Sequence, residues 1–581
     1  MKPTNLEGGQ TMTDQQPDTD PACLGPVRDT AADRRSIPNL HEIAQAAADK
    51  HGECRRPIPM YTYDPDTGDT KYVGAPCKST LESVCPSCAA KARSLRMQQA
   101  HEGWHIETEP VDIKRDPTQH QLELVETRAS LMTNYQEAKA SGDQDMMDGI
   151  REVVSDVDAD LRETGVRGRL PALDPEPKSE RKRSTRRRQD VPDLPRKKID
   201  KATIGRQYAG KYRPSMFITL TLDSYGKINR DGATNADGKP CSDGSAADPD
   251  SYDYRRAARD IVFFPALFDR FVQNYRRATG RDIQYFATVE PQKRGAPHIH
   301  MAVRGTDPRA LILQIAAATY HQVWWPHFDP DNEQYTDGHM PVWDYTAGRF
   351  VDPDNGEPLP SWDEAMDMLD TVDDLEPAHV VTFGKQIDPK DIRGVLGGSE
   401  EASRHVGYLT KYLTKSIAEV IEPQSARAAD HYDRLHAELC KTPCSPNCGV
   451  WLRYGINPKG ATDKTQPGRC KGKAHRRETL GLRGRRVLVS RRWTGKTLPD
   501  HKADRAEFVR QLLAQVGIQK PDTSRLIVKP VEPGDKNVPP REHLVMASIA
   551  QRIKWRAQYE NARLAAGPPG TQQDSSTYNA A

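Results

Sequence analysis

Two short apolar runs, residues 284–290 and 297–304, constrain the fold more than any other part of the chain. Each has the length of a β-strand, and a short glycine-containing turn separates them. Side chains alternate in direction along a strand, so His298 and His300 leave one face while the apolar residues beside them leave the other. The sequence therefore predicts two adjacent strands, with one face that packs and one face that can bind a ligand.

A carboxylate joins the two imidazoles on this predicted surface, because Glu290 closes the first run shortly before His298. Two imidazoles and one carboxylate suit Mn²⁺ or Mg²⁺ and leave positions open for a phosphate oxygen. A structural zinc site would instead use four closed ligands, usually rich in sulfur. With 17 His among 581 residues, chance alone gives about 0.5 His-x-His patterns. The pair by itself could be ordinary surface or core histidines, and Glu290 is what favours a metal site.

A second segment places two phenols and two amines on one side of a helix predicted over residues 401–421. At 100° per residue, Tyr408, Lys411, Tyr412 and Lys415 share an arc about 100° wide. The apolar residues of the same helix fall on a different arc, so ordinary burial does not require the tyrosines. A packing or surface role is the alternative for each tyrosine taken alone.

The two segments complement each other chemically. A phenol with a pKa of about 10 is a poor nucleophile at neutral pH, and neighbouring ammonium groups or a metal-bound phosphate favour its ionised form. Phosphoryl transfer depends mainly on positioning and charge neutralisation. A divalent ion that holds a phosphate in line with a tyrosine oxygen is therefore sufficient, and Lys411 and Lys415 can offset the developing charge.

Most of the ten cysteines fall into two groups. No apolar run approaches the length of a membrane span and the N-terminus lacks a signal-peptide core, so we expect a cytoplasmic chain whose cysteines are thiols or metal ligands. Both groups have the composition of structural zinc sites, with unpaired thiols as the alternative for the first. The first group comprises Cys54, Cys77, Cys85 and Cys88, and the second offers five ligands for four places: Cys440, Cys444, Cys448, Cys470 and His475. Cys23 and Cys241 have no evident role.

Positive charge is concentrated locally, although the formal net charge is only +2. Residues 181–188 and 196–198 form a basic, proline-punctuated stretch that is either a phosphate-neutralising linker or a solvated charge run. A second basic cluster, residues 471–492, is interleaved with apolar residues and should lie on ordered structure, which favours DNA contact. Its candidate DNA-binding residues are Arg485, Arg486, Arg491 and Arg492.

The order of predicted elements favours an α+β fold, an antiparallel sheet with helices on one side. Strands are expected at 216–222, 284–290, 297–304 and 378–383, and helices at 117–165 (two), 254–279, 308–322, 401–421, 500–516 and 541–565. The predicted domains are a disordered N-terminus (1–40), a Cys-rich zinc module (41–105), a helical segment with the basic linker (106–204), a catalytic domain (205–425) with an acidic insertion (329–376), a second zinc and DNA-binding module (426–500), and C-terminal helices with a disordered tail (501–581).

Three motifs in this order resemble those of the HUH endonucleases, and most closely the rolling-circle replication initiators of actinobacterial plasmids and integrative elements. They are the segment 217–222, the segment 294–300 with its two histidines, and the tandem Tyr-x-x-Lys of residues 408–415. The resemblance implies a ferredoxin-like HUH domain in which His298 and His300 bind the divalent ion, with Glu290 as third ligand. It also implies that a tyrosine, Tyr412 more than Tyr408, joins the 5′ end of a nicked strand and leaves a 3′-hydroxyl primer.

The same resemblance bears on zinc and on partners. It favours Cys444, Cys448, Cys470 and His475 as the second zinc set, with Cys440 as the spare. No Walker A motif is present, because Ser490 stands where its first glycine would be needed. A host helicase and a DNA polymerase are therefore implied as partners, together with origin DNA that is single-stranded at the nick. An HUH transposase and a zinc-containing, non-catalytic DNA-binding regulator are the alternatives.

Overall fold

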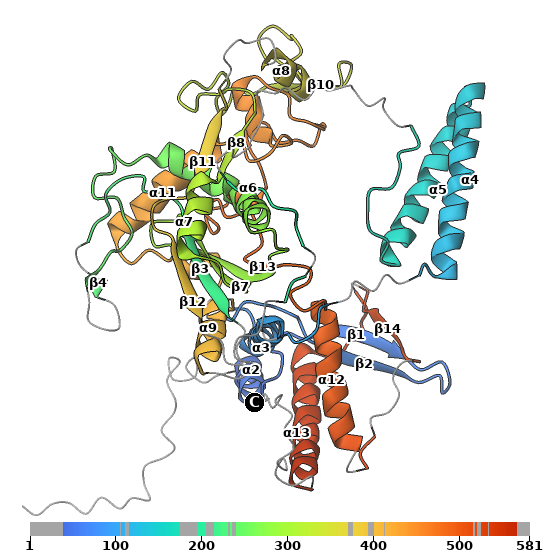
Figure 1. Ribbon diagram of the computed structural model, residues 1–581. Helices are drawn as coiled ribbons and strands as arrows, with labels where there is room; N and C mark the ends of the chain where they lie inside the picture. Colours follow the sequence, from blue (N-terminus) through green and yellow to red (C-terminus); the bar gives the residue numbers. More distant parts are fainter. Residues whose placement is uncertain are drawn as a thin grey trace, which may run out of the picture. The chain divides into compact units, whose positions relative to one another are not determined.

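Two compact units make up the chain in the structure, which is a computed structural model (Figure 1). The first unit comprises Met1–Ala92 and Phe508–Thr571, and the second comprises Arg93–Glu507 and Gln572–Ala581. The structure describes residues 39–104, 106–110, 116–174, 194–200, 202–204, 214–230, 233–234, 240–369, 376–392, 400–411, 413–514, 517–519, 525–532 and 534–565.

A small antiparallel sheet and two packed helices form the first unit. Its strands have the order β14-β1-β2. Helix α2 begins with a capping box, in which Asn39 and Glu42 each bond the other's backbone N–H. Ala44 and Ala48 of α2 pack against Val545 of α13. The elements are α2 (Leu40–Lys50), β1 (Ile58–Tyr63), β2 (Thr70–Ala75), β14 (Ile527–Pro530) and α13 (Arg541–Ala565), with the start of α3 (Pro86–Trp104).

The second unit contains a helical hairpin, α4 (Gln119–Ser141) and α5 (Gln144–Glu163), which confirms the two helices expected over 117–165. Gly142 has a φ of 76°, a left-handed conformation that glycine adopts freely and that ends α4. Asp143 then caps α5 by accepting from the N–H of Met146. The two helices enclose a small core of their own.

A five-stranded antiparallel sheet with the order β12-β3-β7-β6-β13 is the centre of the second unit. The strands and helix predicted at 216–222, 284–290, 297–304 and 254–279 are confirmed within a residue or so. The structure is thus mixed α+β with antiparallel sheets, as expected. The elements not yet given are β3 (Ser215–Thr221), β4 (Ala233–Thr234), β5 (Pro240–Cys241), α6 (Tyr254–Thr279), β6 (Tyr285–Pro291), β7 (Pro297–Arg304), α7 (Arg309–Ala318), β8 (Tyr320–Val323), β9 (Val342–Asp344), β10 (Arg349–Val351), α8 (Trp362–Leu369), β11 (His379–Thr382), β12 (Asp388–Ile392), α9 (Glu400–Thr410), α10 (Ile417–Val420), α11 (Ala426–Lys441), η3 (Gly449–Tyr454), η4 (Lys473–His475), β13 (Val487–Val489) and α12 (Leu498–Ala514).

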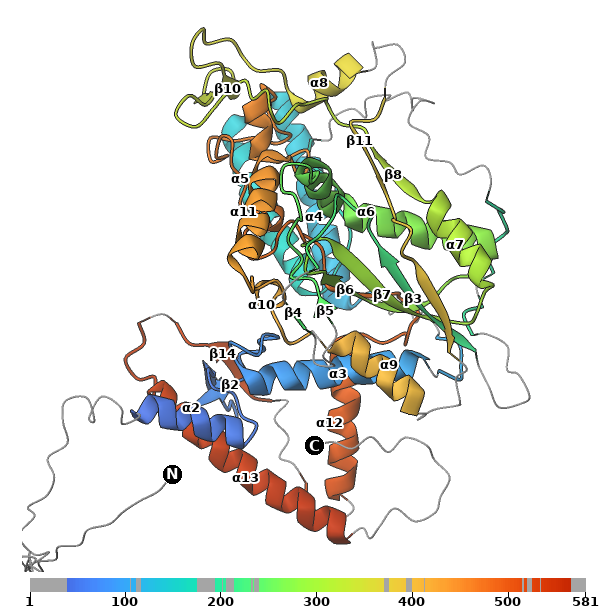
Figure 2. The same ribbon diagram turned by 90° about the vertical axis from the view of Figure 1, so that its left-hand side faces the viewer.

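Both faces of this sheet are covered by helices, so the expectation of helices on one side is wrong. On one face, Phe264 and Phe268 of α6 join Ile218 of β3 and Met301 of β7 in the main core. Each such side chain contributes about 2 kcal/mol when fully buried. On the other face, α9 and residues 97–104 of α3 pack against the sheet (Figure 2). Apolar side chains leave both faces of the central strands, so helices can pack on each face of the sheet.

The tyrosine-bearing helix is shorter than predicted. Helix α9 ends at Thr410, and a new helix, α10, begins only after Ser416. Thr410 turns its hydroxyl back to the carbonyl of Val406, and Ser416 with Glu419 forms a capping box that starts α10. These local hydrogen bonds compete with a continuous helix. The helical arc drawn through residues 408–415 therefore holds only up to Thr410.

The helix predicted at 308–322 also ends early, because β8 takes its last residues and pairs with β11. Between these strands lies the acidic insertion, which carries the β9-β10 hairpin and α8. It has a small core around Tyr335 and Phe350. Arg453 contacts the carboxylates of Glu333 and Asp337, each at 2.6 Å, so part of its acidic charge is neutralised within the unit.

The helices predicted at 500–516 and 541–565 are confirmed as α12 and α13. Among the described helices, none combines the length and the apolar character that a membrane span requires. Tyr412, the basic stretch 181–188 and the N-terminal segment up to residue 38 lie outside the described residues.

Candidate functional site

Strand pairing brings Glu290, His298 and His300 together. In the antiparallel register, Glu290 of β6 lies directly opposite His298 of β7. His300 points to the same face two residues further along. The carboxylate and imidazole ligand atoms of the three residues all lie within 4.8 Å of one another. The period-two pattern in the sequence thus predicted the residues that the sheet gathers.

The two histidines converge through the same ring nitrogen. The Nε2 atoms of His298 and His300 are 2.9 Å apart, and the ring planes are perpendicular at 90°. Neighbouring ligands of an octahedral ion at about 2.1 Å lie about 3 Å apart. The spacing of the two nitrogens therefore fits adjacent positions on a small divalent cation.

Two uncharged residues of β3 hold His300 in place. The hydroxyl of Thr219 lies 3.0 Å from Nδ1 of His300, and the ring of Phe217 stacks on the imidazole with centroids 5.7 Å apart. In the tautomer that turns the Nε2 lone pair toward the other two residues, Nδ1 would carry the proton and donate to the Thr219 hydroxyl. Such a partner fixes the tautomer and orientation of a metal-binding histidine. Sequence reasoning noted this strand as a motif but assigned neither residue a role.

Two members of the triad are buried, His298 is partly buried, and two polar atoms lack hydrogen-bond partners among the described residues. Glu290 and His300 are 4% and 5% exposed, and among the described residues Oε1 of Glu290 and Nδ1 of His298 have no hydrogen-bond partner. Burial raises the pKa of Glu290 to about 7, although Arg486 and Lys411 act to lower it. Burial likewise lowers the pKa of His298 to about 4, and burial with the nearby His298 lowers that of His300 to about 3. Neutral imidazoles and an unpaired carboxylate oxygen are a donor set that a divalent cation would complete.

Tyr408 reaches this triad from the end of α9. Its hydroxyl lies 3.3 Å from Nε2 of His300, and its ring meets the edge of Phe217 at 6.0 Å. Val406 and Leu409, on the opposite side of α9, are buried against the sheet. Tyr408 itself is 46% exposed, so its ring stays accessible from solvent.

Helix α9 is anchored by α3, because Arg93 donates from Nε to the carbonyl oxygen of Thr410 at 3.1 Å. Beyond α9, the backbone N–H of Lys411 bonds the carbonyl of Tyr408. The second tyrosine of the predicted pair, Tyr412, lies outside the described residues, so the preference for it as first nucleophile stays a prediction.

Arg486 belongs to this site and not to an open basic surface. Its Nη1 donates to the carbonyl of Lys415 at 2.6 Å and its Nε lies 3.5 Å from the carbonyl of Val289. Its Nη2 is buried and has no hydrogen-bond partner among the described residues. The guanidinium therefore links strand β6 to the segment after α9 and leaves one donor free beside Glu290. The sequence predicted a DNA contact for this residue but not its place beside the triad.

The other predicted DNA-binding arginines differ in accessibility. Arg485 and Arg491 are exposed, and Arg492 is partly buried. The backbone of Arg492 is held at both ends, by Gln284 and by Arg304. DNA contact by Arg485, Arg491 and Arg492 remains a prediction.

Both cysteine groups form clusters that could hold a metal such as zinc. In the second unit, Cys444, Cys448, Cys470 and His475 bring their ligand atoms within 4.8 Å of one another. The thiols of Cys444 and Cys470 are 4.0 Å apart, and Cys448 lies 3.4 Å from Nε2 of His475. Cys440 stands outside this cluster, with its thiol 3.5 Å from His436. The geometry thus selects the four residues that the resemblance favoured.

Fold and site together define a class of protein in which an antiparallel sheet gathers potential metal ligands beside an accessible tyrosine. The chain belongs to the family described as "RepSA: Replication initiator protein, pSAM2", which matches residues 40–551. A replication initiator protein of Streptomyces ambofaciens is 25% identical over 272 residues, covering 41% of this chain and 52% of that protein. The chain therefore spans about half the length of that relative. No solved structure matches the chain significantly.

Proposed function

We propose that this protein initiates replication of a plasmid or integrative element by nicking one strand of its origin through a tyrosine, in the manner of HUH endonucleases. The observation that carries the proposal is the hydroxyl of Tyr408, 3.3 Å from Nε2 of His300 within the Glu290, His298 and His300 cluster. Membership of a replication initiator family supports the biological role. Phosphoryl transfer supports the chemistry, because it needs a positioned nucleophile and charge neutralisation more than covalent assistance.

Glu290, His298 and His300 are the residues that would hold Mn²⁺ or Mg²⁺, since the unpaired, buried Oε1 of Glu290 and the two converging Nε2 atoms fit such an ion. The ion, when bound, would neutralise and orient the scissile phosphate. Thr219 keeps His300 in the tautomer that presents Nε2. Phe217 stacks on the imidazole of His300 and would shield that face of the ring from water.

The nicking step is a transesterification. The phenol oxygen forms a bond to phosphorus, and the bond from phosphorus to the 3′ oxygen breaks. The phenol loses its proton and the departing 3′ oxygen gains one, so a 3′-hydroxyl is released. The product is a 5′-phosphotyrosine link and a 3′-hydroxyl primer, and the reverse reaction rejoins a strand. Lys411 and Arg486 supply positive charge next to the carboxylate of the triad and would offset charge on the phosphate.

Tyr408 is the phenol whose position supports attack, whereas the resemblance favours Tyr412. Two phenols one helical turn apart in sequence suit a cycle with two cleavages, one to begin and one to end replication. Lys415, whose carbonyl accepts from Arg486, would add positive charge near the phosphate. We include both tyrosines in the proposed catalytic set.

A replication initiator that nicks its origin needs DNA and protein partners, and its second unit would carry a structural metal. Origin DNA, single-stranded at the nick, would contact Arg485, Arg491 and Arg492, and a host helicase and a DNA polymerase would extend the primer. Cys444, Cys448, Cys470 and His475 would hold a structural zinc in the second unit, since four closed, sulfur-rich ligands suit that ion.

The test is the formation of a covalent adduct. Single-stranded DNA that spans the origin is incubated with the full chain and Mn²⁺, and the products are separated on a denaturing gel. We expect a protein–DNA adduct that is lost in His298→Ala and in the double variant Tyr408→Phe, Tyr412→Phe. Tyr345→Phe, at an 80% exposed position, is the matched control and should react normally.

The single tyrosine variants assign the first nucleophile. Loss of the adduct in Tyr408→Phe alone would support attack by Tyr408, and loss in Tyr412→Phe alone would support attack by Tyr412. Intact DNA and no adduct under every metal condition would overturn the nicking proposal and leave a non-catalytic DNA-binding initiator.

A further inference from the structure

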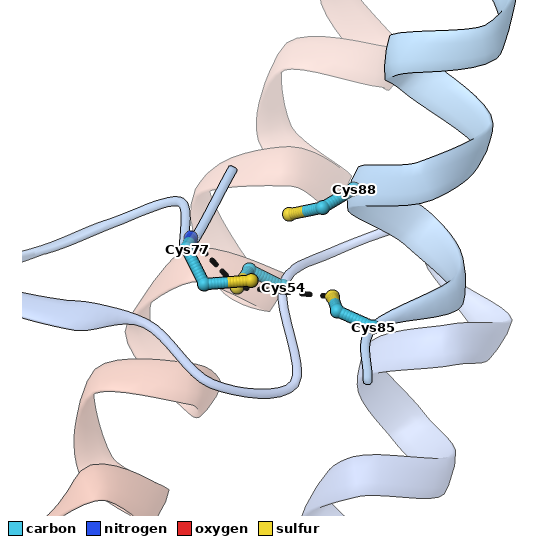
Figure 3. Close-up of side chains that lie close together, drawn as sticks. All are labelled: Cys54, Cys77, Cys85 and Cys88. Carbon is cyan, nitrogen blue, oxygen red and sulfur yellow. Dashed lines mark hydrogen bonds between the residues drawn. The ribbon is translucent and has the colours of Figure 1, made fainter. Parts of the chain in front are cut away.

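Four cysteines of the first unit converge on one point (Figure 3). Cys54 follows α2, Cys77 follows β2, and Cys85 and Cys88 lie at the start of α3. Their sulfur atoms point toward one another and all lie within 4.8 Å. Three loops or helix ends that are distant in sequence therefore meet through sulfur.

The spacing of the sulfurs matches a tetrahedral zinc site and excludes disulfides in this state. The thiols of Cys54 and Cys85 are 3.9 Å apart, and all four cysteines are free. Tetrahedral ligands at a Zn–S distance of about 2.3 Å lie about 3.8 Å apart, whereas bonded sulfurs lie at about 2.05 Å. The backbone N–H of Cys77 also donates to the sulfur of Cys54 at 3.3 Å, an interaction that favours a thiolate.

Three of the four cysteines are buried and Cys77 is partly buried, and among the described residues their hydrophobic cluster contains cysteines alone. Cys54, Cys85 and Cys88 are 4%, 0% and 6% exposed, and the hydrophobic cluster that they form includes only Cys77 besides them. Four sulfurs packed on one another bury little apolar surface. Such a group does not stabilise a fold as a hydrophobic core would.

The apolar core of the first unit is small. Among its described residues, the buried apolar side chains other than cysteine are all small or aliphatic, and no aromatic side chain is buried. They are Ala44, Ala48, Ala89, Leu513, Leu544 and Val545. A unit with so small a core usually depends on a metal or a cross-link for its fold.

We propose that Cys54, Cys77, Cys85 and Cys88 bind one zinc ion as four thiolates, and that the fold of the first unit depends on this ion. The ion ties the end of α2 and the end of the β1-β2 hairpin to the first turn of α3. With four protein ligands and no open position, it is a structural ion that takes no part in any reaction.

The test is the zinc content of the purified full chain. Protein prepared with a reductant and without chelators is analysed for zinc per chain by mass spectrometry, for wild type and for Cys85→Ser and Cys88→Ser. We expect each variant to lose one equivalent of zinc relative to wild type. Cys440→Ser, at a cysteine outside both clusters, is the matched control and should lose none.

A second measurement covers the case in which the cysteine variants do not fold. His475→Ala should remove the zinc of the other cluster and leave this one, whose Co²⁺ form would show the visible absorption of a tetrahedral four-thiolate site. When a strong chelator removes zinc from the His475→Ala protein, tryptic cleavage within residues 51–85 should become at least tenfold faster. Added zinc should restore the slow cleavage.

Two results would overturn the proposal. One is a His475→Ala protein that binds no zinc even when refolded with excess zinc under reducing conditions. The other is recovery of the four cysteines as two disulfides from reduced, folded protein. Neither readout involves DNA, so they stay informative whether or not the chain nicks an origin.

Discussion

His300 depends on two neighbours that carry no charge. Its Nδ1 reaches the hydroxyl of Thr219, and Phe217 stacks on its ring. At the scale of single residues, such contacts decide whether the Nε2 atom presents a lone pair to a cation. The ligand and its orienting partner face each other across the β3–β7 pairing, since Thr219 is the register partner of His300.

Thr219→Val should therefore weaken metal binding without unfolding the chain. The valine keeps the shape but removes the hydroxyl that fixes the tautomer, and the loss of such a partner lowers metal affinity about 10–100-fold. Mn²⁺ titration followed by electron paramagnetic resonance measures the affinity. Thr219→Ser, which restores the hydroxyl, should bind nearly as wild type, and equal affinity in Thr219→Val and wild type would show that the hydrogen bond has no role.

Arg486 and Arg485 are adjacent but should behave differently. Arg486→Gln removes a partly buried positive charge beside Glu290, so we expect the rate of adduct formation to fall about a hundredfold, the scale of losing one preorganised donor. Arg485→Gln, at an exposed position, should leave the rate at saturating DNA unchanged and only weaken DNA binding, with a shallower salt dependence. Single-turnover rates of adduct formation and DNA affinities at several salt concentrations distinguish the two variants. Similar rates for both variants would contradict the placement of Arg486 in the site.

At the scale of elements, the β8–β11 ribbon carries a partly buried histidine outside the Glu290, His298 and His300 triad. His321 of β8 lies across from Val381, with its ring 6.1 Å from Phe263. Burial lowers its pKa to about 4, and the nearby Arg270 and Arg483 act in the same direction. The imidazole is therefore neutral in the folded state at neutral pH.

His321 makes the stability of the fold depend on pH. In the unfolded chain this histidine titrates near pH 6.5, so the unfolded state binds a proton first as the pH falls. The stability present above about pH 6.5 is lost progressively as the pH falls toward 4, by at most about 3 kcal/mol. His321→Phe should reduce the loss of stability over this range, measured by urea unfolding at several pH values. If the stability of the variant and of wild type fell equally between about pH 6.5 and about pH 4, His321 would have no part in the pH dependence.

Strand positions could be predicted from the sequence, whereas helix ends and distant neighbours could not. The alternation around His298 is a local property of a β-strand, so both strands and their shared face followed directly. The end of α9 depends on side-chain caps at Thr410 and Ser416 that compete with an otherwise regular pattern. Arg486 meets Glu290 only because β13 pairs with β6 across about two hundred residues, and charge spacing carries no information about such a pairing.

At the scale of the whole molecule, the residues that could hold a metal fall into two kinds. Each unit has a sulfur-rich cluster with four ligands, and the second unit alone has the Glu290, His298 and His300 triad. Closed thiolate sites suit a slowly exchanging structural ion, whereas a three-ligand oxygen and nitrogen site leaves positions for substrate. The molecule thus separates the ions expected to hold the fold from the ion expected to act on DNA.

Brief treatment with EDTA should therefore stop nicking and leave the fold intact. The triad offers no soft ligand and only three protein donors, so its divalent ion should exchange rapidly, while zinc held by buried thiolates should remain. We expect adduct formation to disappear, circular dichroism and zinc content to stay as in untreated protein, and Mn²⁺ alone to restore the activity after the EDTA is removed. If EDTA instead unfolds the chain in step with the loss of activity, or if nicking persists without a divalent ion, the division between structural and reactive metals is wrong. His298→Ala should match EDTA-treated wild type in fold and zinc content but should not recover with Mn²⁺, which locates the exchangeable ion at the triad.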